Sequence, residues 1–225
     1  MTNAIPVITV DGPSGVGKGM VTRWLAAETG YHRLDSGALY RILALASLEQ
    51  GIPLEEVDAV AALAKDLDIQ FVGETEDDEA ILVVGNDWTR RIRTEETGAL
   101  ASRIAAAPAV RTALLQRQHD FRRAPGLIAD GRDAGTVIFP DAKLKIFMDA
   151  TPEERAARRE KQLRNAGIAV NFAALCQEIR ARDARDRGRE VAPLKPADDA
   201  HLIDTTGLSP DEVIHRVKAL LATSR

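Results

Sequence analysis

The sequence predicts an α/β fold in which a five-stranded parallel sheet is flanked by helices. Five short apolar runs alternate with longer segments of helical periodicity, and such alternation is typical of parallel strands joined by crossover helices. A glycine-rich loop comes directly after the first run and opens a helix. The expected strands are 7–10, 32–35, 126–130, 144–148 and 201–204, and the expected helices are 21–29, 38–50, 54–66, 94–107, 109–123, 151–162, 171–187 and 209–222.

Local signals set several of these boundaries. Ser36 is expected to be the N-cap of the helix 38–50, because its hydroxyl can accept a hydrogen bond from the first helical turn. Pro152 lies in the first turn of its helix, where a backbone N–H is not needed. Pro108 separates two helices, because proline cannot donate within a helix.

Residues 67–93 have a different pattern. Short strand candidates at 69–71, at 80–84 and around Trp88 are separated by 73–79 and by the hairpin turn signal at 85–87. We therefore expect a small antiparallel insertion within a single domain that spans the 225 residues.

Composition narrows the classes of protein to consider. The net charge of −4 and the pI of about 5.7 argue against general binding to nucleic acid or to a membrane surface, where a basic balance is expected. Cys176 is the only cysteine, which excludes an internal disulfide and fits a reducing cytosol. The N-terminal residues lack the basic segment of a signal peptide, and no apolar run is long enough to span a bilayer.

The loop after the first strand has the pattern of a phosphate-binding loop. Its sequence GPSGVGK fits the first seven positions of G-x-x-x-x-G-K-[ST]. Glycines let successive backbone N–H groups point at phosphate oxygens, the following helix adds its partial positive charge, and the lysine reaches the outer phosphates. An ordinary glycine turn would not require this spacing. The residues expected to bind the nucleotide are Gly12, Pro13, Ser14, Gly15, Val16, Gly17, Lys18, Gly19 and Met20.

One position in the loop departs from the expected pattern. The run resembles the G-x-x-G-x-G-K-G-T of nucleoside-monophosphate kinases, which accounts for Gly19, but the threonine of that run is Met20 here. A hydroxyl that would contact phosphate is therefore absent. The sequence leaves open whether Thr22 compensates for it.

The strand 126–130 ends in a group of polar residues. Asp130 resembles the carboxylate of the second P-loop motif, which orients Mg²⁺ directly or through water. Arg132 and Asp133 follow at the carboxyl end of this strand, where ligands bind in parallel sheets. Earlier in the chain, Ser36 at a helix start and Arg41 could also hold phosphate, although a capped helix with an exposed arginine explains that segment equally well.

Residues 180–190 concentrate positive charge. Five arginines and three carboxylates give this stretch a local charge of +2 within an acidic protein. If the stretch is helical, Arg182, Asp186 and Arg189 share one face, whereas Asp183 and Arg187 would form a solvated pair on another. A water-excluding lid that carries arginines suits phosphoryl transfer, because negative charge develops on the transferred group.

These segments together resemble the bacterial cytidylate kinase family. The similarity runs from ITVDGPSGVGKG through LDSGALYR, IRTEE, PGLIADGRDAGTVIFPDAKLKIFMDA and RDARDRGREVAPL to the C-terminal helix. The resemblance implies a P-loop kinase fold with a nucleotide-binding insertion at 67–93 and a helical lid at about 155–190. It also implies a cytoplasmic monomer that uses Mg²⁺, transfers the γ-phosphoryl group of ATP to CMP or dCMP, and has no nucleic-acid or membrane partner.

The resemblance also implies roles for individual residues. Lys18, Arg132, Arg182 and Arg189 would stabilise the transferred group, and Asp130 would hold the metal. The acceptor phosphate would be bound by Ser36, Arg41, Arg132 and Arg189, the ribose by Arg182 and Asp186, and the cytosine by Ser102, Arg111 and Asp133. An arginine donor beside a carboxylate acceptor complements cytosine, whereas uracil would leave buried groups unpaired.

Three alternatives remain from the sequence. The protein could be a P-loop kinase with another acceptor, or a relative made inactive by Met20. It could also be a GTP-dependent switch, but that class carries an N-K-x-D type of guanine motif, and the later part of the sequence has none.

Overall fold

The structure, a computed structural model, describes residues 5–72, 80–165 and 167–224. The chain forms two compact units. Unit 1 comprises residues 1–35 and 119–225, and unit 2 comprises residues 36–118. The segment 73–79, predicted as a connection within the insertion, lies outside the described residues.

Unit 1 is built on a five-stranded sheet in which every neighbouring pair is parallel, as predicted. Strand β1 has all five of its residues buried, as expected for a central strand covered on both faces. The strands lie in the order β2-β6-β1-β7-β8, with bounds β1 (Val7–Asp11), β2 (His32–Asp35), β6 (Leu127–Gly131), β7 (Leu144–Asp149) and β8 (His201–Asp204).

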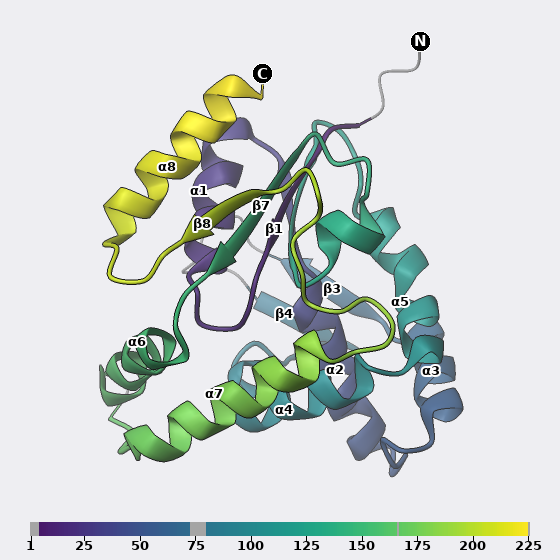
Figure 1. The fold of residues 1–225 in the computed structure, drawn as a ribbon. Helices are drawn as coiled ribbons and strands as arrows, with labels where there is room; N and C mark the ends of the chain where they lie inside the picture. The colour runs from purple at the N-terminus through teal and green to yellow at the C-terminus, as the bar shows by residue number, and fades with distance from the viewer. Residues whose placement is uncertain (1–4, 73–79, 166, 225) are drawn as a thin grey trace. The chain divides into compact units, whose positions relative to one another are not determined.

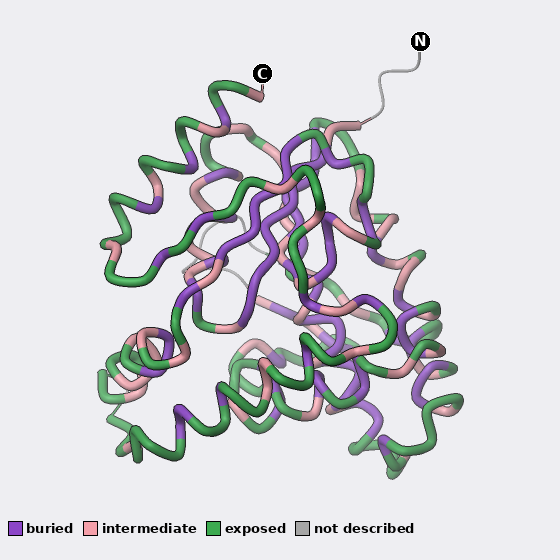
Figure 2. The backbone as a smooth tube through the Cα atoms, in the orientation of Figure 1, coloured by how far each residue is buried: buried purple, intermediate pink, exposed green. Residues whose placement is uncertain are grey.

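Helices pack against this sheet (Figure 1). They are α1 (Lys18–Thr29), the short π-helix η2 (Ala134–Ile138) and α8 (Pro210–Thr223). Helices α1 and α8 lie side by side, and their buried residues, such as Leu25 and Val217, join the apolar side chains of the sheet in one core. Figure 2 shows the central strands as almost continuously buried, whereas α8 alternates between buried and exposed positions.

Two further helices of unit 1 form a pair of their own. Helices α6 (Pro152–Asn165) and α7 (Phe172–Arg187) pack through a small apolar cluster of Ala156, Leu175, Cys176 and Ile179. Asn171 caps α7 by accepting a hydrogen bond from the Ala174 N–H at 3.1 Å. Helix α7 ends at Arg187, so Arg189 lies beyond the helix rather than on its face as predicted.

Unit 2 combines helices with a small antiparallel sheet. Its elements are α2 (Ser36–Glu49), α3 (Val57–Asp66), β3 (Ile69–Val72), β4 (Ala80–Val83), β5 (Asn86–Asp87), the 3₁₀ turn η1 (Arg91–Arg93), α4 (Glu95–Ile104) and α5 (Pro108–Asp120). Unit 2 ends at Gln118, within α5. Ser36 is the first residue of α2 rather than the residue before it. The core joins α2 to the sheet through residues such as Ile42, Val83 and Trp88.

The hairpin of unit 2 is displaced from its predicted position. Strands β4 and β5 pair Leu82 with Asp87 and Val83 with Asn86, so the turn consists of Val84 and Gly85. Both turn residues have positive φ, 48° and 74°, which a two-residue type I′ turn requires. Trp88, predicted to lie within a strand, instead follows β5.

Candidate nucleotide-binding site

The glycine-rich loop of unit 1 connects β1 to α1, as the sequence predicts. Gly12 has a φ of 147°, and a Cβ at this position would lie 2.1 Å from the Met148 carbonyl oxygen of β7. Only glycine fits this conformation and this close approach. Gly17 has a φ of 99° and leads directly into α1, which begins at Lys18. The loop therefore presents its backbone at a helix N-terminus, which favours anion binding.

Lys18 is buried beside two carboxylates. Its Nζ donates to the Pro13 carbonyl at 2.9 Å and lies 3.7 Å from Asp130 Oδ1. Asp35 is the register partner of Asp130 on the neighbouring strand. Burial lowers the pKa of Lys18 to about 8, and Arg132 acts in the same direction, whereas Asp130 and Asp35 oppose the change. Phosphate oxygens near Nζ would favour its charged form.

The residues beside Lys18 also suit a magnesium ion. Burial raises the pKa of Asp130, and Lys18 opposes this effect. Asp130 and Asp35 end adjacent parallel strands, so two carboxylates lie at one edge of the sheet, and carboxylate oxygen is the ligand type that Mg²⁺ prefers. Among the described residues, no group of three or more His, Cys, Asp or Glu side chains could hold a metal by itself. A magnesium ion here would take further ligands from nucleotide phosphates and water.

The structure shows where the hydroxyl of Thr22 lies relative to the phosphate loop. Its side chain is 1% exposed, and Thr22 Oγ1 donates to the Gly19 carbonyl at 3.2 Å. Thr22 therefore does not present its hydroxyl to the loop and cannot replace the missing threonine. Met20 is partly buried and packs against the core of unit 1.

Asp186 gathers the predicted arginines of unit 1 into one cluster. Its carboxylate is 2% exposed and accepts from Arg132 Nε at 3.4 Å and from Arg189 Nη2. Arg182 Nε lies 4.0 Å from the same carboxylate. Residues from the segment directly after β6, from α7 and from the segment after α7 thus converge on a single buried anion, and three guanidinium groups share its charge.

The predicted pair of Asp183 and Arg187 is wrong. Asp183 instead pairs with Arg155 of α6, and Arg187 donates to Asp149 Oδ2 at 2.8 Å. Both partners are distant in sequence, so helical spacing alone could not identify them.

Asp11, at the end of β1, is a functional candidate that sequence reasoning missed. Its carboxylate accepts from the backbone N–H groups of Ala134 at 2.8 Å and Gly135 at 2.7 Å, the two residues that follow Asp133. Burial raises the pKa of Asp11 to about 7, although the two N–H donors oppose the change. Asp11 therefore fixes the backbone next to Asp133. Its place at the end of a strand, directly before a glycine, was the available signal.

Unit 2 contains the remaining predicted residues. Arg41 of α2 donates to the Ile92 carbonyl at 2.5 Å and to the Thr94 carbonyl at 2.9 Å. Arg111 is 7% exposed, donates to the Ala105 carbonyl at 3.3 Å, and has its guanidinium 5.9 Å from the centre of the Tyr40 ring. Both arginines are therefore held in defined positions. Ser36 and Ser102, on α2 and α4, are also largely buried.

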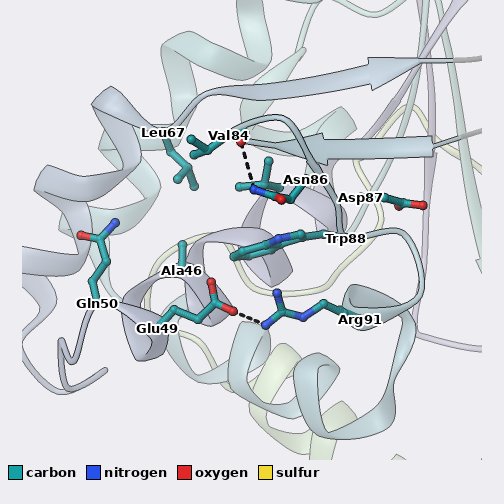
Figure 3. A pocket seen from close by; sticks show the side chains of 10 residues that line it. Ala46, Glu49, Gln50, Leu67, Val84, Asn86, Asp87, Trp88 and Arg91 are labelled. Atoms are coloured by element: carbon teal, nitrogen blue, oxygen red, sulfur yellow. Dashed lines mark hydrogen bonds and ion pairs between the residues drawn. The ribbon is translucent and has the colours of Figure 1, made fainter.

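A pocket of about 300 Å³ in unit 2 is a separate feature (Figure 3). Arg91 lies 4.5 Å above the Trp88 ring and forms an ion pair with Glu49. The pocket lining comes from the end of α2, from the β4–β5 hairpin and from Leu67 and Arg91, and it includes none of the predicted site residues.

Comparisons with known proteins identify the family to which the chain belongs. The model of the cytidylate kinase family matches residues 8–223. A cytidylate kinase of Aeromonas hydrophila subsp. hydrophila is 57% identical over 219 residues, which cover 97% of this chain and 95% of that protein. A cytidylate kinase of Stutzerimonas stutzeri is 54% identical over 224 residues, which cover 99% of this chain and 97% of that protein. In the part of the chain that the structure describes, no helix is long and apolar enough to cross a membrane. The motifs, the fold and these matches agree, and the chain belongs to the cytidylate kinase family.

Proposed function

We propose that the protein transfers the γ-phosphoryl group of ATP to CMP or dCMP, giving CDP or dCDP and ADP. The observation that carries the proposal is the phosphate loop of unit 1, with the buried Lys18 at 3.7 Å from Asp130. Membership of the cytidylate kinase family supports CMP as the acceptor. The proposal includes a monomer in the cytoplasm, which acts on nucleotides and not on nucleic acid or membranes.

The transfer requires no general base. The acceptor is already an anionic phosphate oxygen, which attacks the γ-phosphorus while the bond to the bridging oxygen of ADP breaks. Alignment and charge stabilisation therefore supply most of the rate enhancement. Lys18 holds the β- and γ-phosphates, and Arg132, Arg182 and Arg189 neutralise charge on the transferred group and the acceptor phosphate.

Magnesium would be held at Asp130, directly or through water. When bound with ATP, it neutralises charge on the phosphate oxygens. The region of about 155–190 acts as the lid in this proposal, because it contains α7 and two of the arginines gathered by Asp186, Arg182 and Arg189.

The base and sugar of CMP are assigned to a second group of residues. Ser102, Arg111 and Asp133 read the cytosine edge, whose N3 and O2 accept and whose N4 donates. Asp186 meets the ribose together with Arg182, and Ser36 and Arg41 bind near the acceptor phosphate. The buried state of Arg111 and Asp133 supports the assignment, because an unmatched base would leave such groups unpaired.

A panel of acceptors tests the proposed substrate. ADP release is measured with ATP and Mg²⁺ on CMP, dCMP, UMP and AMP. We expect CMP and dCMP to be used with much higher kcat/KM than UMP or AMP, because a site built to hydrogen-bond one base edge rejects others strongly. Preference for UMP or AMP would contradict the base-reading roles. ATP hydrolysis that does not depend on an acceptor would instead favour a switch protein.

Two substitutions test the charge-stabilising residues. Lys18→Ala and Arg189→Ala should each lower kcat by roughly a hundredfold or more, because each removes charge stabilisation of the transferred group. Arg185→Ala is the matched control, since Arg185 is an exposed arginine of the same segment. The control should keep kcat within about twofold of the native value. Near-normal kcat in both test variants would refute the assigned roles.

A further inference from the structure

Arg155 of α6 makes a set of contacts that the reaction described above does not use. Its side chain is only 1% exposed. Arg155 Nε donates to the Ala150 carbonyl at 3.0 Å, and Nη1 donates to the Ser14 carbonyl of the phosphate loop at 3.1 Å. Nη1 also donates to Asp183 Oδ1 at 3.0 Å, and Nη2 donates to the other oxygen of that carboxylate. One guanidinium thus joins the end of β7, the phosphate loop and α7.

The phosphate loop and α7 are therefore tied to the same side chain. The backbone of the loop also packs against Arg155, because a Cβ at Gly15 would lie 3.4 Å from the Arg155 Cβ. Asp183 is 13% exposed and directly follows Arg182 on α7. One helical turn further on, Asp186 holds Arg132 and Arg189. The position of Asp183 thus helps to set the position of the arginines next to it.

The chemistry of the contact favours a fixed geometry. A planar guanidinium that binds both oxygens of a carboxylate defines direction as well as distance, which an ammonium group cannot do. The pair is buried, so separating its members would leave a charge without compensation in a poorly solvated environment. Residues that pack only for volume would not need four donors aimed at three separate segments.

We propose that Arg155 is a positioning residue that couples the phosphate loop to the arginines of α7 through Asp183. The loop and the arginines must act on the same γ-phosphoryl group. The shared guanidinium holds the loop and the arginines in a fixed position relative to each other. This inference rests on the proposed roles of Arg182 and Arg189.

The test weakens the contact between Arg155 and α7 while Arg155 keeps its hydrogen bond to the phosphate loop. Asp183→Asn removes the charge and one acceptor oxygen, but Arg155 can still donate to the Ser14 and Ala150 carbonyls. We expect kcat at saturating ATP and CMP to fall roughly ten- to a hundredfold, since small misplacements of catalytic groups have effects of this size. The Kd for ATP without acceptor should stay within about twofold, and hydrogen exchange in residues 172–187 should become faster.

The matched control is Asp149→Asn. Asp149 also binds an arginine of α7, Arg187, at 2.8 Å, but this pair is exposed, and within the described residues neither side chain hydrogen-bonds to the phosphate loop. The Asp149→Asn variant should keep kcat within about twofold of the native value. If Asp183→Asn does not give folded protein, Arg155→Lys is measured in the same way, because it keeps the positive charge and loses the two-pronged contact.

Two results would overturn the inference. One is a kcat within about twofold of the native value in the folded variant, and the other is a loss of ATP affinity as large as the loss of kcat, which would limit Arg155 to supporting the loop. The roles of Arg182 and Arg189 are judged separately. Normal kcat in Arg182→Ala and Arg189→Ala would refute the proposed roles of these arginines, whereas impaired kcat there with a normal Asp183→Asn would refute the coupling alone.

Discussion

At the scale of single residues, the carboxylate of Asp11 holds the chain just after Asp133. It is buried at the end of β1 and accepts two backbone N–H groups, from Ala134 and Gly135. These donors favour the ionised carboxylate, whereas burial favours the neutral acid and is the larger effect, so that the pKa of Asp11 rises to about 7. The backbone beside a proposed base-reading residue thus depends on a group that titrates near neutral pH.

The raised pKa of Asp11 predicts a pH-dependent stability. Below about pH 4 the group is protonated in the folded and unfolded states, and its contribution to stability is complete. Between about pH 4 and pH 7 only the unfolded chain releases the proton readily, so the stability difference between the native protein and Asp11→Asn should shrink as pH rises. The full change is on the order of 4 kcal/mol, from a shift of about three pKa units.

Denaturant unfolding of both proteins from pH 4.5 to 8 measures this difference. Asparagine does not titrate, and the variant keeps every other titratable group. The pH dependence of the variant therefore reports those other groups, and subtracting it isolates the contribution of Asp11. A stability difference that stays constant over this range, or that grows with pH, would show that burial does not raise the pKa of Asp11.

At the scale of elements, the β4–β5 hairpin shows how a turn can override side-chain preference. Val84 has a φ of 48°, a conformation that β-branched residues rarely adopt, and its side chain is 65% exposed. The Val84 N–H donates to the Asp68 carbonyl at 3.0 Å, which helps to hold the turn. Pairing of β4 with β5 in this register requires positive φ here, whichever residue occupies the position.

Val84→Asn should therefore stabilise the protein by about 1 kcal/mol, because asparagine tolerates the left-handed conformation that valine resists. The free energy of unfolding in urea measures the change. Val72→Asn is the control, because Val72 is also partly exposed but lies in β3 with ordinary strand backbone. That control should be destabilised, since asparagine is unfavourable in strands. Equal destabilisation of both variants would contradict the turn geometry.

At the scale of the whole molecule, the proposed binding of ATP predicts a ligand-dependent stability. A ligand that binds only the folded state at a hundred times its Kd stabilises it by about 2.7 kcal/mol. For a chain of this size that raises Tm by roughly 5 to 10 °C. Lys18→Ala should lose most of the shift with ATP and keep the shift with CMP, because Lys18 is assigned to the ATP phosphates alone.

Thermal unfolding with each nucleotide checks this expectation. Adenosine and cytidine, which lack phosphate, are the control ligands and should give much smaller shifts. An unchanged ATP shift in Lys18→Ala would show that the buried ammonium does not contribute to binding.

The sequence by itself determined the parallel sheet, the phosphate loop and the family. Strand β2 has the predicted bounds, as does β8, and the loop lies between β1 and α1 as expected. These features are local, because β-branched runs, glycine spacing and helix caps act within a few residues. The roles of Ser102 and Arg111 came only from the resemblance and remain proposals.

Only the tertiary structure decided which charged residues meet. The arginine-rich stretch was recognisable, but Asp183 pairs with Arg155, 28 residues away, and Asp11 binds backbone more than 120 residues away. Such partners are chosen by strand order and helix packing, because a buried charge must be compensated by whatever group the fold brings within reach. Helical spacing therefore identified the charges of α7 but not their partners, and packing decided that one buried arginine contacts both the phosphate loop and α7.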